Sequence, residues 1–123
     1  MKREIHTTAA KEHLRVAEEY NAKTQTEKDE NKRIAFRTVA SHNYFYAGTN
    51  AIEATLAGKD THSFNHENRN RNMMENPELF DDELYSLYNE VERDLRNKVA
   101  YRGNNGKMYE KLKRFAAKAN GDV

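Results

Sequence analysis

The chain of 123 residues has no cysteine, one proline and no long apolar run. Without cysteine it can form no disulfide, bind no metal through thiolates and use no catalytic thiol. No stretch approaches the roughly 18 apolar residues that a transmembrane helix needs. The first residues, Met-Lys-Arg-Glu-Ile-His, carry positive charge without an apolar segment behind it, so no signal peptide is expected. These absences predict a cytoplasmic protein with no membrane segment.

Apolar residues are scarce as well. They make up 37% of the chain against 33% charged residues, and the mean hydropathy is −1.13. Such a chain would be disordered if its apolar residues were scattered, but they recur at the three- and four-residue spacing of helices. The alternation typical of strands is missing. The length predicts one helical domain over residues 1–123, and its polarity predicts that it completes its core as a homodimer or against a partner.

Five helices fit this spacing, and they predict an all-α, up-and-down bundle of four to five helices. Thr7 and Thr8 are the expected N-caps of the first helix, and Gly58 is the expected end of the second. Apolar residues surround the second helix between residues 34 and 56, which indicates a central, buried helix. Its small residues around Gly48 would let another helix approach, and they are one possible dimer surface. The expected ranges are about 9–22, 29–57, 62–75, 81–103 and 107–119.

The net charge of +1 hides an asymmetry. Residues 93–123 contain nine Lys and Arg against three acids, whereas the other 92 residues contain twelve against seventeen. A cationic segment of this kind can bind an anion such as RNA. It can equally complement the negative ends of helix dipoles. The sequence leaves both uses open.

The residues best suited to bind a ligand lie at the end of the fourth helix: Arg96, Asn97, Tyr101 and Arg102. A guanidinium at Arg96 can bind a phosphate, although Glu92, four residues earlier, is placed to pair with it instead. Arg96 and Tyr101 converge only if the helix bends or ends between them, or if they face each other across a dimer.

Two histidines, His62 and His66, are spaced to share one helical face, as metal ligands sometimes are. A zinc site needs at least a third ligand and a supporting shell. Glu67 is adjacent, but the zinc-protease pattern needs a Glu directly after the first His, where Ser63 stands, so we expect no metal and no cofactor.

Four segments resemble, in their order along the chain, the HEPN family of small α-helical domains. They are residues 12–19, 45–56, 61–62 and 95–101, which include the family's aromatic- and alanine-rich central helix and a Thr-His pair after it. The resemblance implies a helical bundle that dimerises. It also implies a frequent partner, a small nucleotidyltransferase, in a toxin–antitoxin or defence pair.

Many HEPN proteins are RNases that use an Arg, a following polar residue and a His four to six positions after the Arg. Arg96 and Asn97 match the first part, but Tyr101, five positions after Arg96, stands within the range where the His is expected. Imidazole has a pKa near 6.5 and can both take and return a proton, whereas a tyrosine with a pKa near 10 is a poor base at neutral pH.

The resemblance therefore implies a nucleotide- or RNA-binding or nucleotidyltransferase-partner module without efficient RNase activity. Arg96, Asn97, Tyr101 and Arg102 would line its site. One alternative is an active, metal-independent RNase that uses Arg96. The other is a purely structural or interaction bundle.

Overall fold

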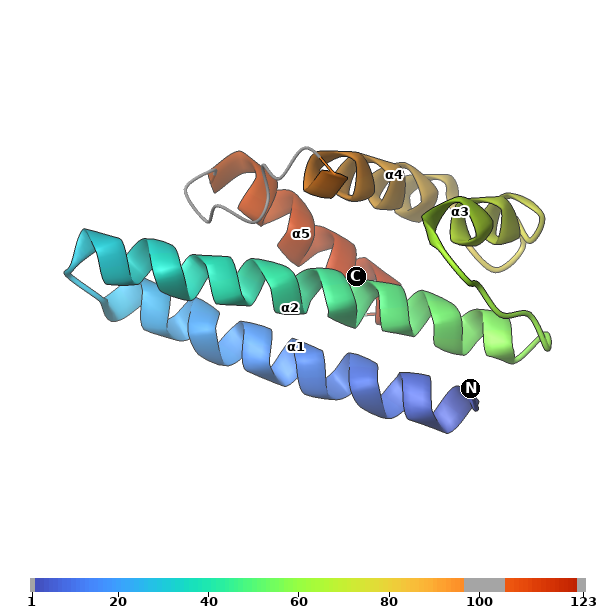
Figure 1. Cartoon of the computed structure of the whole chain (residues 1–123), viewed down its shortest axis with the longest axis horizontal. Helices are drawn as coiled ribbons and strands as arrows, with labels where there is room; N and C mark the ends of the chain where they lie inside the picture. The colour runs from blue at the N-terminus through green and yellow to red at the C-terminus, as the bar shows by residue number, and fades with distance from the viewer. Residues whose placement is uncertain (1, 97–105, 122–123) are drawn as a thin grey trace.

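The computed structural model describes residues 2–96 and 106–121, except for the side chains of Leu95 and Arg96. The secondary structure of these residues consists of five helices and no strand, which confirms the predicted all-α class. Figure 1 shows α1 and α2 as a long antiparallel pair, α5 crossing α2, and α3 and α4 on the side of α2 away from α1. The helices are α1 (Arg3–Thr26), α2 (Glu30–Ala57), α3 (His66–Met74), α4 (Asp82–Arg96) and α5 (Gly106–Ala119).

The first helix is longer at both ends than predicted. It begins at Arg3, and the hydroxyl of Thr7 donates to the carbonyl of Arg3 inside the helix, so Thr7 does not cap it. No proline or glycine stops the helix before Thr26, and packing along α2 stabilises the polar turns that spacing alone could not assign. The turn to α2 therefore has only three residues. Asp29 ends it as an N-cap, accepting the backbone N–H of Lys32 at 2.9 Å.

Helix α2 is central, as predicted, because α1 packs on one side of it and α5 on another. Its buried residues lie between Ala40 and Leu56. The first turns of α2 are more exposed, since α1 is their main helical neighbour among the described residues (Figure 1), and Val39 is 36% exposed. The predicted burial of the whole apolar range was therefore too broad at its start.

Gly48 lies where α5 meets α2. A Cβ atom built on it would lie 2.1 Å from Cε2 of Phe115, whose side chain is fully buried. Phe115 also contacts the rings of Phe45 and Tyr88, with centroids 6.2 and 6.1 Å away. The predicted close approach at Gly48 is confirmed. Because α5 of the same chain occupies this face, it is not the dimer surface that the sequence left open.

The acidic helix α4 and the basic helix α5 pair through their charges as well as their apolar faces. Three cations of α5 are thus engaged by acids at the start and middle of the α4 segment, and this pairing accounts for part of the charge asymmetry of the sequence. Four ion pairs between described residues join the two segments: Lys111–Glu90 at 3.2 Å, Lys118–Asp81 at 2.8 Å, Lys118–Glu83 at 3.4 Å and Arg114–Glu83.

Three buried tyrosines, Tyr44, Tyr88 and Tyr109, predict how stability depends on alkaline pH. Burial raises the pKa of Tyr109 to about 12, and it raises the pKa of Tyr44 and of Tyr88 above the ordinary value. The unfolded chain releases these protons near pH 10, whereas the folded chain keeps them. We expect the free energy of unfolding to be unaffected by these groups below pH 10. Above it, each tyrosine should lower this free energy, and Tyr109 should lower it by about 1.4 kcal/mol per pH unit up to about pH 12.

Urea unfolding followed by circular dichroism at pH 9, 10 and 11 measures this decline. The variant Tyr109→Phe isolates one tyrosine from the lysines that titrate in the same range, and it should show a shallower decline. Tyr109 also donates to Asn21 at 2.5 Å, so the variant should start from a lower stability at pH 9. Parallel declines in the two proteins would contradict the prediction.

Candidate functional site

The predicted site residues lie at and beyond the end of α4. Arg96 is the last residue of that helix, and its side chain is outside the described part of the structure. Asn97, Tyr101 and Arg102 belong to residues 97–105, which are also outside it. The described residues around the last turns of α4 therefore show what surrounds this position.

A buried ion pair joins α2 to α3 beside these turns. The Nε of Arg69 donates to Oε2 of Glu53 at 2.8 Å, and the backbone N–H of Ser63 donates to Oε1 of Glu53 at 3.3 Å. Glu53 is only 6% exposed. A buried carboxylate is tolerated when it is paired and hydrogen-bonded, so Arg69 and Ser63 together allow Glu53 to lie there.

Arg69 extends this pair toward α4. Its Nη1 donates to the hydroxyl of Tyr88 at 3.4 Å and lies 3.5 Å from Nδ1 of His66. Burial alone would lower the pKa of Arg69, but its hydrogen bonds to Glu53 and Tyr88 outweigh burial and raise the pKa. Arg69 is therefore a permanently charged centre that holds α3 against both α2 and α4.

His66 completes the arrangement at the surface. Its Nδ1 lies 3.9 Å from Oε1 of Glu92 on α4, and its side chain is 51% exposed while that of Glu92 is 10% exposed. Glu92 precedes Arg96 by four residues, about 6 Å along the helix axis. We call Glu53, Arg69, Tyr88, His66 and Glu92 the polar cluster. It places an accessible imidazole beside Glu92, which lies about one helical turn before Arg96.

The sequence did not reveal this placement of His66. Helix α3 begins at His66 instead of His62, because Asn65 caps it by accepting the backbone N–H of Asn68 at 2.8 Å. His62 lies before the helix, so the predicted shared helical face of the two histidines was wrong. The spacing of Asn65 and Asn68 resembles a capping box and was the signal that could have located this start.

The stretch 69–72 is basic and rich in amide side chains, a composition typical of a solvated surface. The structure divides it: Arg69 points into the polar cluster, Asn72 is buried with its Nδ2 donating to Oγ of Ser63 at 3.1 Å, and Arg71 is exposed. Spacing within the stretch could not show this, because the partner of Arg69 is sixteen residues away on α2.

Two searches of the described residues bear on the remaining classes of site. In residues 2–96 and 106–121, no group of three or more His, Asp or Glu side chains is arranged to hold a metal ion. The same part of the chain contains no helix with the length and apolar character needed to cross a bilayer.

Comparison with known proteins returned no match to a protein-family model, to a curated protein or to a solved structure. The resemblance to the HEPN family therefore stays a prediction that rests on the four sequence segments.

Proposed function

We propose that the chain is a HEPN-like helical module that binds a nucleotide or RNA where α3 meets the end of α4. The observation that carries the proposal is the position of His66, half-exposed against Glu92, which precedes Arg96 by one helical turn on α4. A ligand phosphate there would meet the guanidinium of Arg96, with Asn97, Tyr101 and Arg102 following in the chain. Arginine and a protonated imidazole both donate charge-assisted hydrogen bonds to phosphate oxygens.

The charges of α5 support this location over the rest of the basic segment. Lys111, Arg114 and Lys118 are engaged by acids of the α4 segment, so binding an anion there would first break an existing pair. The buried pair of Glu53 and Arg69 also supports it, because it fixes α3 on α2, and the same arginine donates to Tyr88 of α4, without depending on a ligand. A site whose walls are already in place loses less conformational entropy on binding.

The proposal includes the partners that the HEPN resemblance implies. These are a second copy of the chain and a small nucleotidyltransferase of a toxin–antitoxin or defence pair, with the complex acting in the cytoplasm. A neighbouring gene for such a nucleotidyltransferase would support this part of the proposal. Light scattering at micromolar concentration tests the homodimer, since a monomeric mass would remove it.

Fluorescence anisotropy of a labelled single-stranded RNA tests binding directly. We expect Arg96→Ala to weaken binding about tenfold and to reduce the salt dependence by about one counterion, because one phosphate contact is lost. His66→Ala should weaken binding as well, because the imidazole can no longer donate a hydrogen bond to a phosphate oxygen.

A matched control is Arg15→Ala on α1, which removes an exposed cation that contacts Glu12 of the same helix at 3.0 Å. It changes the net charge by the same amount as Arg96→Ala and should leave RNA binding almost unchanged. Equal losses in the two variants would mean that RNA responds only to net charge, and the proposed site would then be wrong.

A second function, metal-independent RNA cleavage, is favoured by the same pair of His66 and Glu92. An imidazole that lies near Arg96 supplies the base that Tyr101 cannot. His66 would take the proton of a 2′-hydroxyl, the 2′-oxygen would attack the phosphorus, and the 5′-oxygen would leave with a proton from solvent.

Incubation of the same RNA with EDTA present separates cleavage from binding. If the wild-type protein cleaves the RNA and both Arg96→Ala and His66→Ala do not, the protein is an RNase and the proposal of binding alone is wrong. If the wild-type protein neither binds nor cleaves RNA, and nucleotides leave its thermal unfolding unchanged, the structural or interaction bundle becomes the better account.

A further inference from the structure

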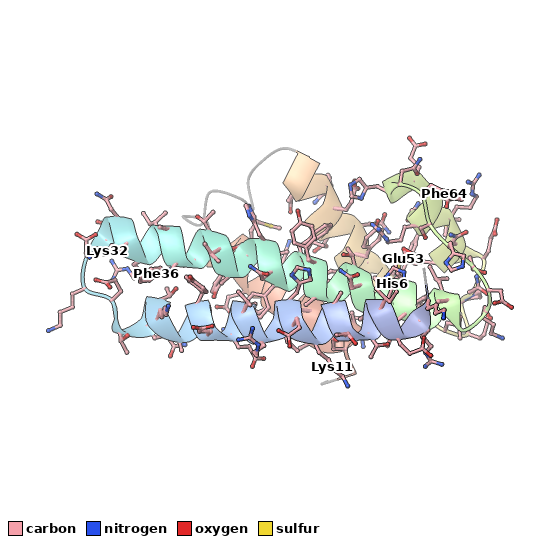
Figure 2. All side chains as sticks on the ribbon, turned by 60° about the horizontal axis from the view of Figure 1, so that its bottom comes forward. His6, Lys11, Lys32, Phe36, Glu53 and Phe64 are labelled. Atoms are coloured by element: carbon pink, nitrogen blue, oxygen red, sulfur yellow. The ribbon has the colours of Figure 1, made fainter. Side chains whose placement is uncertain are left out.

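A shallow hollow of about 300 Å³ lies on the part of α3 that does not contribute to the polar cluster. Its lining consists of Phe64, Asn65, Glu67, Asn68 and Arg71. Phe64 is 90% exposed, more than any other large hydrophobic side chain of the described residues. In Figure 2 Phe64 lies beside α3, at the opposite end of the molecule from Lys32 in the first turn of α2. An aromatic ring this exposed contributes nothing to the core.

The backbone beneath Phe64 is held in place. Its N–H donates to Oδ1 of Asn68 at 3.1 Å, while Oδ1 of Asn65 accepts the backbone N–H of Asn68. These reciprocal hydrogen bonds fix the chain at the start of α3. The ring of Phe64 is therefore presented on a rigid segment, and its exposure is not that of a loosely tethered loop.

The polar groups of the hollow suit a nucleotide. Arg71 is exposed, and no carboxylate of the described residues lies within ion-pair distance of it. The hollow also contains the carboxylate of Glu67, and a carboxylate can accept a hydrogen bond from the amino group of cytosine. An exposed aromatic ring beside an arginine is the combination by which proteins bind unpaired bases and their phosphates.

We infer that Phe64 and Arg71 form a stacking site for one unpaired base of a single-stranded RNA, with the adjoining phosphate on Arg71. The inference rests on the proposed function and extends it, because Phe64 is only two residues before His66. An RNA strand held at the polar cluster would continue over the start of α3 onto this hollow.

A single tryptophan tests the contact itself. The chain has no tryptophan, so Phe64→Trp introduces one fluorophore at the proposed site. We expect oligocytidylate to quench it in a saturable manner, since a stacked base quenches indole fluorescence. The matched control is Met74→Trp, at the other end of α3 and 60% exposed, which should not be quenched. Inorganic polyphosphate, which has no bases, should leave both variants unquenched.

Affinity gives an independent measurement. Phe64→Ala should weaken the binding of oligocytidylate about 5- to 150-fold, the range found when one stacking ring is removed. Arg71→Ala should reduce the salt dependence by about one counterion. Circular dichroism checks that each variant is folded.

The outcomes separate this inference from the function on which it rests. If RNA binds the wild type and Phe64→Ala equally and does not quench Phe64→Trp, the stacking site is wrong while the proposed function stands. If no variant binds RNA, both are wrong. If Phe64→Ala instead converts a dimer to a monomer in light scattering, Phe64 is a contact between copies and the stacking site is wrong.

Discussion

Replacement of Arg69 by methionine should lower the free energy of unfolding by about 3–5 kcal/mol, the usual effect of removing one member of a buried ion pair. Glu53 would keep its charge in a site where it is 6% exposed, and only the N–H of Ser63 would remain to stabilise it. Tyr88 would lose the guanidinium next to its hydroxyl as well. Urea unfolding followed by circular dichroism measures the effect.

Two further variants separate the loss of charge pairing from the loss of packing. The double variant Glu53→Gln with Arg69→Met removes both charges and should recover most of the stability, because no unpaired carboxylate stays buried. Arg15→Met breaks an exposed pair with Glu12, whose side chains are 63% and 62% exposed, and should change the stability by less than about 1 kcal/mol. A loss below about 1 kcal/mol in Arg69→Met would show that water reaches Glu53.

The variant Arg69→Met also tests how the stability of the fold is connected to RNA binding. Arg69 connects α3 to α2 and α4, so its loss should free the start of α3 and with it His66. We therefore expect Arg69→Met to weaken RNA binding even at temperatures where the protein remains folded. Such a positioning role differs from that of Arg96, whose removal should leave the stability nearly unchanged.

The variant Gly48→Ala should also destabilise the fold, by about 3 kcal/mol, the upper part of the range for an overpacked core. Inside an exposed helix the same change would stabilise by about 1 kcal/mol, because alanine favours the helix. Here the added methyl would lie 2.1 Å from the ring of Phe115. That ring cannot move aside, since it is fully buried between Phe45 and Tyr88.

Thermal unfolding measures this loss, and a second substitution identifies its cause. Phe115→Leu removes the part of the ring that meets Gly48, so the double variant with Gly48→Ala should be less destabilised than the sum of the two single variants. The control is Gly106→Ala at the start of α5. A Cβ there would meet nothing within 4 Å, so this substitution should be tolerated. Additive losses would show that the contact with Phe115 is not the reason.

Much of the helical architecture follows from local signals in the sequence. Apolar spacing predicted five helices, and Gly58 predicted the end of α2, because a helix-ending glycine acts through neighbouring backbone groups. Gly48 predicted that a helix would approach α2. At the start of α1 the expected caps, Thr7 and Thr8, lie inside the helix, so the predicted boundary was wrong.

The candidate site was much less predictable. Arg96, Asn97, Tyr101 and Arg102 were chosen for their chemistry and for a family resemblance, and their side chains lie outside the described residues. His66 was not predicted to belong to the site. Its contact with Glu92 depends on α3 and α4 packing together, and these residues are twenty-six positions apart.

The amino-acid sequence alone determined that this chain is helical, where most of its helices lie and which faces are apolar, since propensity, caps and periodicity act over only a few residues. Only the tertiary structure decided which charges are buried together. The pairing of Glu53 with Arg69, the meeting of His66 with Glu92 and the engagement of the α5 cations by α4 join segments distant in the chain. Because a charge attracts any opposite charge that packing brings near, the composition gives the number of charged groups but not which of them form pairs.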